Sequence, residues 1–102
     1  MTQVLLTSQA DADVDDIIAG IGARAGRRSA DKSVAEFDRL FLRLAEYPLS
    51  GSPRKTLGPN VRISSLWPDV AIYEYDEGKD VGMILRILHG HREISRHVTK
   101  DP

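Results

Sequence analysis

The hydrophobic positions near the C-terminal end of the chain follow the pattern of a buried β-strand. Between Met83 and Leu88, every residue except Arg86 is apolar. Successive side chains in a strand point to opposite faces. One face would therefore carry Met83, Leu85, Ile87 and His89, and the other Ile84, Arg86 and Leu88. Because both faces are largely apolar, the pattern predicts an interior strand covered on both sides, and the flanking Gly82 and Gly90 favour a strand over a helix.

Two earlier segments have the spacing of amphipathic helices. The first would start after Ser8 as the N-cap, with Asp11 as its capping partner, and its glycines predict a loose last turn. Its apolar stripe consists of Ala10, Val14, Ile17, Ile18 and Ile21. Aspartates at its start and arginines at its end suit the helix dipole. The second helix would run from about Asp31 to Tyr47, where Pro48 stops it.

The buried face of this second helix is predicted to carry Val34, Phe37, Leu40, Phe41 and Leu44. A short link around residues 26–30 would make the two helices an antiparallel hairpin. Further strands are predicted at residues 3–7, 61–66 and 70–75, with a loop over 48–60 and a hairpin turn over 76–80. The predicted fold is therefore α+β, in the order β-α-α-β-β-β, with a helical hairpin packed on a largely antiparallel four-stranded sheet. We expect one domain over residues 1–102, frayed from residue 95.

The composition narrows the class of protein without identifying it. Hydrophobic residues make up 41% and charged residues 28% of the chain, as in ordinary soluble domains. The absence of cysteine excludes a disulfide framework and a thiolate site. Because no apolar run is long enough for a membrane span and no leader pattern begins the chain, we expect a cytoplasmic protein with no membrane partner. The net charge is −1, but the second half is locally basic.

Several segments together resemble the ParE branch of the RelE/ParE toxins, the toxic halves of bacterial type II toxin–antitoxin pairs. They are LAEYP at 44–48, RKTLGPNVR at 54–62, IYEY at 72–75 and ILRILHGHREI at 84–94. The resemblance covers the whole chain in element order, and its strongest part closes the last predicted strand. It implies a toxin that poisons DNA gyrase and is silenced by a cognate antitoxin that wraps it. The RelE branch of the superfamily instead cleaves messenger RNA on the ribosome.

The candidate target-binding residues are basic or contain imidazole. They are Arg54, Lys55, Arg62, His89, His91 and Arg92. Guanidinium groups suit both phosphate and an acidic protein surface, whereas a solvated loop remains the simpler interpretation for Lys55. His89 and His91 are spaced as in a strand but have no clear third ligand, so we expect no metal and no cofactor.

The enzymatic alternative is a ribosome-dependent endoribonuclease of the RelE type. It would need an acid–base set beside cations that hold the phosphate. Arg92 matches a basic residue of the RelE branch, in which Gly-Lys-Arg-Glu stands where this chain has Gly90-His-Arg-Glu93. The C-terminal tyrosine of that branch has no counterpart, since no tyrosine follows Tyr75. This departure favours a toxin that acts by binding, with no catalytic residue assigned. A relative that has lost its toxicity is the third possibility.

The antitoxin is expected to dock by its C-terminal segment, as a helix in a groove, as an added strand, or both. The candidate contacts beside the two helices are Ile17, Ile21, Phe37 and Phe41. The toxin–antitoxin complex could be a hetero-oligomer, and no sequence-specific DNA binding by this chain is expected. Arg86 needs a partner if it is buried in its strand, and Glu74 is the expected one. Trp67 and Tyr75 are expected to pack in the core or against a hairpin.

Overall fold

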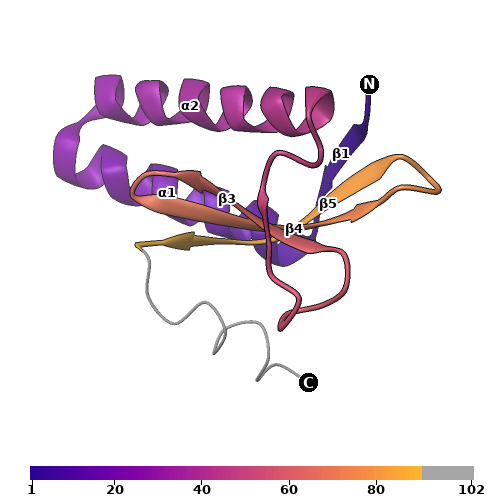
Figure 1. The fold of residues 1–102 in the computed structure, drawn as a ribbon. Helices are drawn as coiled ribbons and strands as arrows, with labels where there is room; N and C mark the ends of the chain where they lie inside the picture. Colours follow the sequence, from indigo (N-terminus) through magenta and orange to yellow (C-terminus); the bar gives the residue numbers. More distant parts are fainter. Residues whose placement is uncertain (91–102) are drawn as a thin grey trace.

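The computed structural model describes residues 1–90, in which two helices pack on one face of a five-stranded sheet (Figure 1). The elements are β1 (Gln3–Leu6), α1 (Ser8–Ala25), α2 (Arg27–Glu46), β2 (Ser52–Pro53), β3 (Val61–Leu66), β4 (Asp69–Asp76) and β5 (Val81–His89). The predicted order and helical hairpin are confirmed. The predicted number of strands was one too low, because part of the expected loop over 48–60 forms β2 on the edge of β3.

The sheet is mixed, with strand order β1-β5-β4-β3-β2. Strands β2 to β5 are antiparallel to their neighbours, whereas β1 runs parallel to β5. The pairing with β1 covers only the first part of β5, from Val81 to Ile84. Side chains of Thr7, which caps α1, and of Asp13 on α1 contact the backbone of β5 beyond that point. The predicted interior position of the last strand is therefore correct over its first half.

A register shift between β4 and β5 changes the faces that were predicted for β5. Ile72 pairs with Arg86, but the next residue, Tyr73, pairs with Ile84, so Leu85 is an extra residue on β5. An extra residue reverses the alternation of side chains beyond it. Ile84 and Ile87 consequently pack with the helices, whereas Leu85 and Leu88 pack on the opposite face. The strict alternation predicted for this strand was wrong for that reason.

Two apolar clusters lie on the two faces of the sheet. The cluster under the helices consists of Ala10, Phe37, Leu40, Leu44, Ala71, Tyr73, Ile84 and Ile87. The cluster on the other face consists of Val61, Ile63, Val70, Ile72 and Leu88, with Leu57 and Leu85 packed against it. Burial on both faces explains why β4 and β5 carry nearly continuous apolar runs.

The helix ends differ from those predicted. Thr7, not Ser8, caps α1: its Oγ1 accepts a hydrogen bond from the Ala10 N–H at 3.0 Å. Helix α2 begins at Arg27 because Gly26, with φ at 89°, makes the whole turn between the helices in one residue. A positive φ of this kind favours glycine. Val34, predicted to be buried, is 41% exposed, so the buried face of α2 is narrower than its apolar pattern.

Candidate functional site

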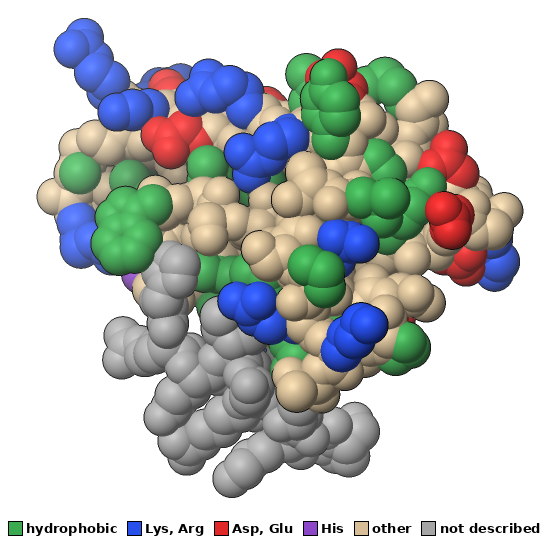
Figure 2. Space-filling view, viewed as in Figure 1, with side chains coloured by type: hydrophobic (Ala, Val, Ile, Leu, Met, Phe, Trp, Pro, Cys, Tyr) green, Lys and Arg blue, Asp and Glu red, His purple; other side chains and the backbone are tan. Residues whose placement is uncertain are grey.

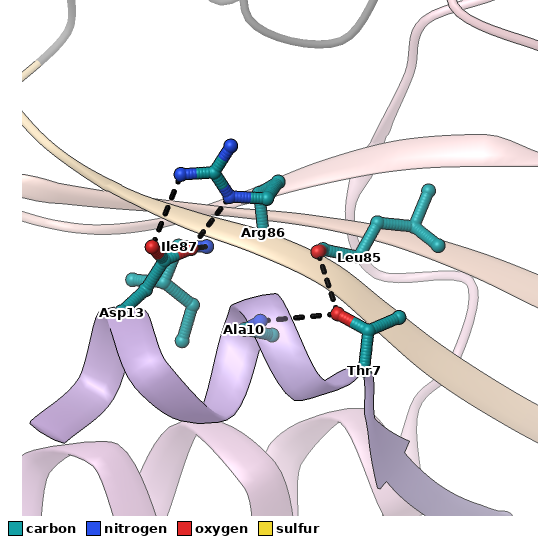
Figure 3. A network of polar contacts seen from close by, with 6 residues as sticks. All are labelled: Thr7, Ala10, Asp13, Leu85, Arg86 and Ile87. Atoms are coloured by element: carbon teal, nitrogen blue, oxygen red, sulfur yellow. Dashed lines mark hydrogen bonds and ion pairs between the residues drawn. The ribbon is translucent and has the colours of Figure 1, made fainter. Parts of the chain in front are cut away.

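Arg86 forms an ion pair with Asp13 on α1 (Figure 3). Its Nε donates to Asp13 Oδ2 at 2.8 Å, and its Nη2 donates to Asp13 Oδ1 at 3.1 Å. The backbone N–H of Ile87 also donates to Asp13 Oδ2, at 2.9 Å. The prediction that Arg86 is structurally paired is thus confirmed, but Glu74 was the wrong partner. Glu74 pairs with Met83, three residues away along β5, and its side chain is exposed.

The same region shows how α1 covers the part of β5 that extends beyond β1. Thr7 Oγ1 donates to the carbonyl oxygen of Leu85 at 2.8 Å, while Asp13 accepts from the N–H of Ile87 (Figure 3). An uncovered strand edge would present such groups to any extended peptide. The N-cap residue Thr7 and Asp13 of α1 therefore occupy hydrogen-bonding positions that an added strand would need.

Three cavities lie along α1 and the end of β5, with volumes of about 240, 180 and 440 Å³. His89 lines all three of them. Ile17 lines the first two and Ile21 the third, so both predicted antitoxin contacts border this run of cavities, called the α1 groove below. Phe37 is only 2% exposed, and its ring stacks on that of Phe41 with centroids 6.2 Å apart. Phe37 therefore belongs to the core, and Phe41 is half-buried against it.

His89 is held by a carboxylate from the neighbouring strand. Its Nδ1 lies 2.6 Å from Oδ1 of Asp69, whose side chain is 8% exposed, compared with 51% for the imidazole. Because a carboxylate accepts the hydrogen bond, Nδ1 carries the proton and Nε2 remains for another contact. Trp67, just before Asp69, is 77% exposed, which contradicts its predicted packing in the core or a hairpin. Tyr75 does pack against the helix-side cluster, as expected.

The basic candidates of the second half lie around the loop that precedes β3. Arg62 Nη1 donates to the carbonyl oxygens of Leu49 and Gly51, at 3.1 and 2.7 Å. The guanidinium therefore has a structural task, the closure of the loop after α2. Arg54 and Lys55 are exposed, and Lys55 lines a cavity of about 450 Å³ together with Arg62.

Tyr73 closes the same loop from inside the core. Its hydroxyl donates to the carbonyl oxygen of Pro48 at 2.7 Å and accepts from the N–H of Gly51 at 2.9 Å. Burial raises the pKa of Tyr73, an effect that the hydrogen bond from Gly51 partly opposes. A Cβ at position 51 would lie 2.6 Å from the tyrosine oxygen, so only glycine fits there.

The structure separates the predicted target-binding residues into two groups. Arg62 is in register with Tyr73 and Ile84, near the start of β5, whereas His89 is in register with Asp69 at its end. Arg54, Lys55 and Arg62 therefore lie at one end of the sheet and His89 at the other. On the face of the molecule that Figure 2 shows, the Lys and Arg side chains are dispersed and are not gathered in one patch. The other two candidates, His91 and Arg92, and the expected frayed tail lie outside the described residues.

Within residues 1–90, no group of three or more His, Cys, Asp or Glu side chains is arranged to hold a metal ion. No helix among these residues is long and apolar enough to span a membrane.

Comparison with known proteins decides the family. Residues 4–94 match the sequence profile of the ParE toxin of type II toxin–antitoxin system, parDE. The chain belongs to the ParE toxin family. Toxin ParE3 of Caulobacter vibrioides is 29% identical over 100 residues, which cover 98% of each chain.

Solved structures place the ParE family chain in the same fold. The chromosomal ParDE toxin–antitoxin system of P. aeruginosa has a chain with a TM-score of 0.73 and 27% identity, over 89% of this chain and 98% of that one. The RelBE2 toxin–antitoxin complex of Mycobacterium tuberculosis has a chain with a TM-score of 0.65 and 22% identity, over 86% and 90%. The predicted toxin family and fold are therefore confirmed.

Sequence reasoning missed Asp13, Asp69 and the exposure of Trp67. Asp13 was hidden in a run of acidic residues that the helix dipole already explained. Asp69, the first residue of β4, was assigned to the preceding turn, where aspartate is common for local reasons. One sequence signal for Trp67 was its place before a proline between two strands, where a side chain at the tip of a short turn has few neighbours.

Proposed function

We propose that this ParE family toxin inhibits DNA gyrase by binding it directly, and that a cognate antitoxin neutralises it. The observation that carries the proposal is the match to the ParE toxin family over residues 4–94. The similar chain from P. aeruginosa was solved within a ParDE toxin–antitoxin system, which supports an antitoxin as the partner here. Arg86, the only charge in the apolar run of β5, is paired with Asp13, so we assign it a structural task and not a catalytic one.

The α1 groove is the proposed docking surface for the antitoxin. Ile17 and Ile21 supply apolar contacts, and Asp13 and Asp16 line its first cavity. A helical segment with apolar residues flanked by Lys or Arg would complement this lining. Because Thr7 and Asp13 already occupy the edge of β5, we favour helix-in-groove docking there over strand addition.

The proposed gyrase-binding surface lies at the opposite end of the sheet, with Arg54 and Lys55 as its exposed cations. Arg62 contributes by holding the loop 48–51 in place through two carbonyl oxygens. His89, His91 and Arg92 remain candidates for a second contact region near the end of β5. Replacing Arg54 and Lys55 by alanine should therefore reduce gyrase inhibition in a graded way without changing the melting temperature.

The test is induction of the chain in bacteria, scored both for the DNA damage response and for transcript cleavage. Gyrase inhibition predicts the DNA damage response, and loss of supercoiling activity by purified gyrase when the purified chain is added. A preparation containing the antitoxin should restore supercoiling. Ribosome-stimulated transcript cleavage with intact gyrase activity would instead support the endoribonuclease alternative and contradict the proposal.

A further inference from the structure

One cavity of the molecule combines an exposed aromatic ring with cations. It lies where the β3–β4 turn meets the two helices near the turn that joins them, at the left of Figure 1. Its volume is about 440 Å³, within the usual range of small-molecule sites, about 300–1,000 Å³. The lining includes Arg24, Lys32, Ser33, Trp67, Asp69 and His89. This cavity is the third of the α1 groove, so a ligand bound here would compete with the antitoxin for that groove. The proposed gyrase surface at Arg54 and Lys55 lies at the other end of the sheet.

Trp67 is the only tryptophan of the chain, and it is 77% exposed. The turn that carries it is well anchored. Leu66 and Asp69 are paired across the turn, and the N–H of Gly90 donates to the carbonyl oxygen of Pro68 at 2.9 Å. A large aromatic ring on a fixed turn can stack on a flat ligand without the entropic cost of ordering a loop.

The polar groups of this cavity come from three other elements. Arg24 is on α1 and Lys32 is on α2, while His89 ends β5. The buried carboxylate of Asp69 fixes the imidazole through Nδ1, so Nε2 is the nitrogen that a ligand can reach. When protonated, Nε2 donates to a phosphate oxygen, and when neutral it accepts from a hydroxyl. Two carboxylates line the cavity: that of Asp69 is bound to His89, and that of Glu36 is the one that a ligand phosphate would have to avoid.

We propose that this cavity binds a nucleoside phosphate, either free or as one unit of a single strand. The base would stack on Trp67, the phosphate would lie between Arg24 and Lys32, and His89 would contact the ribose or phosphate oxygens. Stacking on an aromatic ring beside cations is the usual way in which proteins hold unpaired nucleotides. Arg24 and Lys32 distinguish this cavity from the first cavity of the α1 groove, where Asp13 and Asp16 face the proposed antitoxin.

The single tryptophan makes the proposal directly measurable. The full chain is titrated with AMP, ATP, a short single-stranded oligonucleotide and inorganic phosphate, and the tryptophan fluorescence is followed. We expect saturable quenching by the nucleotides and the oligonucleotide but not by phosphate alone. Equal affinities for AMP and the oligonucleotide would identify a free nucleotide as the ligand, whereas tighter binding of the oligonucleotide would identify a strand.

Variants separate this site from general attraction to anions. In calorimetric titrations, Trp67→Ala should weaken nucleotide binding at least about fivefold, and Trp67→Phe should retain most of it because a ring remains. The double variant Arg24→Ala with Lys32→Ala should weaken binding about tenfold or more. Arg54→Ala and Tyr47→Ala are the matched controls, since both residues are exposed and neither lines this cavity.

These substitutions are at exposed positions, so the melting temperatures should stay close to that of the parent chain. The proposal is overturned if no nucleotide quenches the fluorescence at millimolar concentration. It is equally overturned if Arg54→Ala weakens binding as much as the Arg24 and Lys32 changes do. Neither result would affect the proposed inhibition of gyrase, which is measured by supercoiling.

Discussion

Asp13 accepts hydrogen bonds from the side chain of Arg86 and from the backbone of the next residue along β5. One carboxylate on α1 thus satisfies the charge inside the last strand and a donor on the edge of that strand. The side chains of the two partners are 16% and 22% exposed, so the pair is shielded from water but not sealed from it. Its contribution to stability should lie between those of surface and buried ion pairs.

Asp13→Ala should therefore destabilise the fold more than Arg86→Met does. Removing the carboxylate deletes the acceptor of all three hydrogen bonds, and we expect a loss of about 2–3 kcal/mol in the free energy of unfolding. Arg86→Met keeps the apolar stem and leaves Asp13 bound to Ile87, so the expected loss is about 1–2 kcal/mol. Urea denaturation of both variants checks the order. Asp16→Ala, an exposed carboxylate on the same helix, is the control and should change stability by less than about 0.5 kcal/mol.

Removing the hydroxyl of Tyr73 should loosen the loop after α2. Tyr73→Phe leaves the N–H of Gly51 and the carbonyl of Pro48 without their partner in the core, at an expected loss of about 1–3 kcal/mol. Tyr47→Phe, at a tyrosine that is 63% exposed, should be nearly neutral. Thermal and urea unfolding of the two variants measure the difference. Equal stabilities would show that water replaces the lost hydroxyl without loss.

The same residue predicts a loss of stability in alkali. Because burial raises the pKa of Tyr73, the folded state keeps its proton where the unfolded chain begins to release it. The contribution of Tyr73 to stability should fall as the pH rises above about 10, the ordinary value of tyrosine. Unfolding curves at several alkaline pH values should show a smaller decline for Tyr73→Phe than for the parent chain.

Asp80 should make the attachment of the N-terminal segment sensitive to acid. The hydroxyls of Thr2 and Tyr75 donate to Asp80 Oδ1 at 2.6 and 2.8 Å, and these hydrogen bonds lower the pKa of the carboxyl. The folded state therefore favours the carboxylate. Its stabilising effect is present above the unfolded value of about 3.9 and is lost as the pH falls through the lower folded value.

The test is Asp80→Asn, because asparagine tolerates the φ of 53° at this position. The Asp80→Asn variant should be less stable than the parent at neutral pH. This difference in the free energy of unfolding should shrink below about pH 4. Stability is read from urea unfolding at each pH. A difference that stays constant down to pH 2 would contradict the role given to this carboxylate.

Two neighbouring hydroxyl residues at the start of α1, Thr7 and Ser8, should differ in their contribution to stability. Thr7→Ala removes both the cap on Ala10 and the hydrogen bond to Leu85, and should reduce stability by about 1–2 kcal/mol. Thr7→Ser keeps the hydroxyl and should retain most of this stability. Ser8→Ala, the position that sequence alone favoured as the cap, should be nearly neutral. A larger loss for Ser8→Ala than for Thr7→Ala in thermal unfolding would reverse the assignment.

The sequence predicts the helices and strands well because the hydrophobic pattern of each extends over many residues. The stripe of α1 and the apolar run of β5 each repeat often enough to identify a helix and a strand. The partner of Arg86 was not predictable, since it depends on the extra residue at Leu85 and on the rotation of α1 over the sheet. Phe37 illustrates the same limit at the candidate site: its spacing places it on the apolar side of α2, but only the packing shows that the sheet, not a groove, receives it.

The parallel pairing of β1 with β5 also has a consequence for folding. The hydrogen bonds of Thr2 to Asp80, of Thr7 to Leu85 and of Asp13 to Arg86 join residues 73 to 78 positions apart. We expect contacts of such long sequence separation to form late, because closing a long loop costs entropy before any contact compensates for it. During synthesis, the first strand and the edge of α1 can find their partners only after almost the whole described chain has been made. We therefore expect the α1 groove, one wall of which is the end of β5, to be completed among the last features of the toxin.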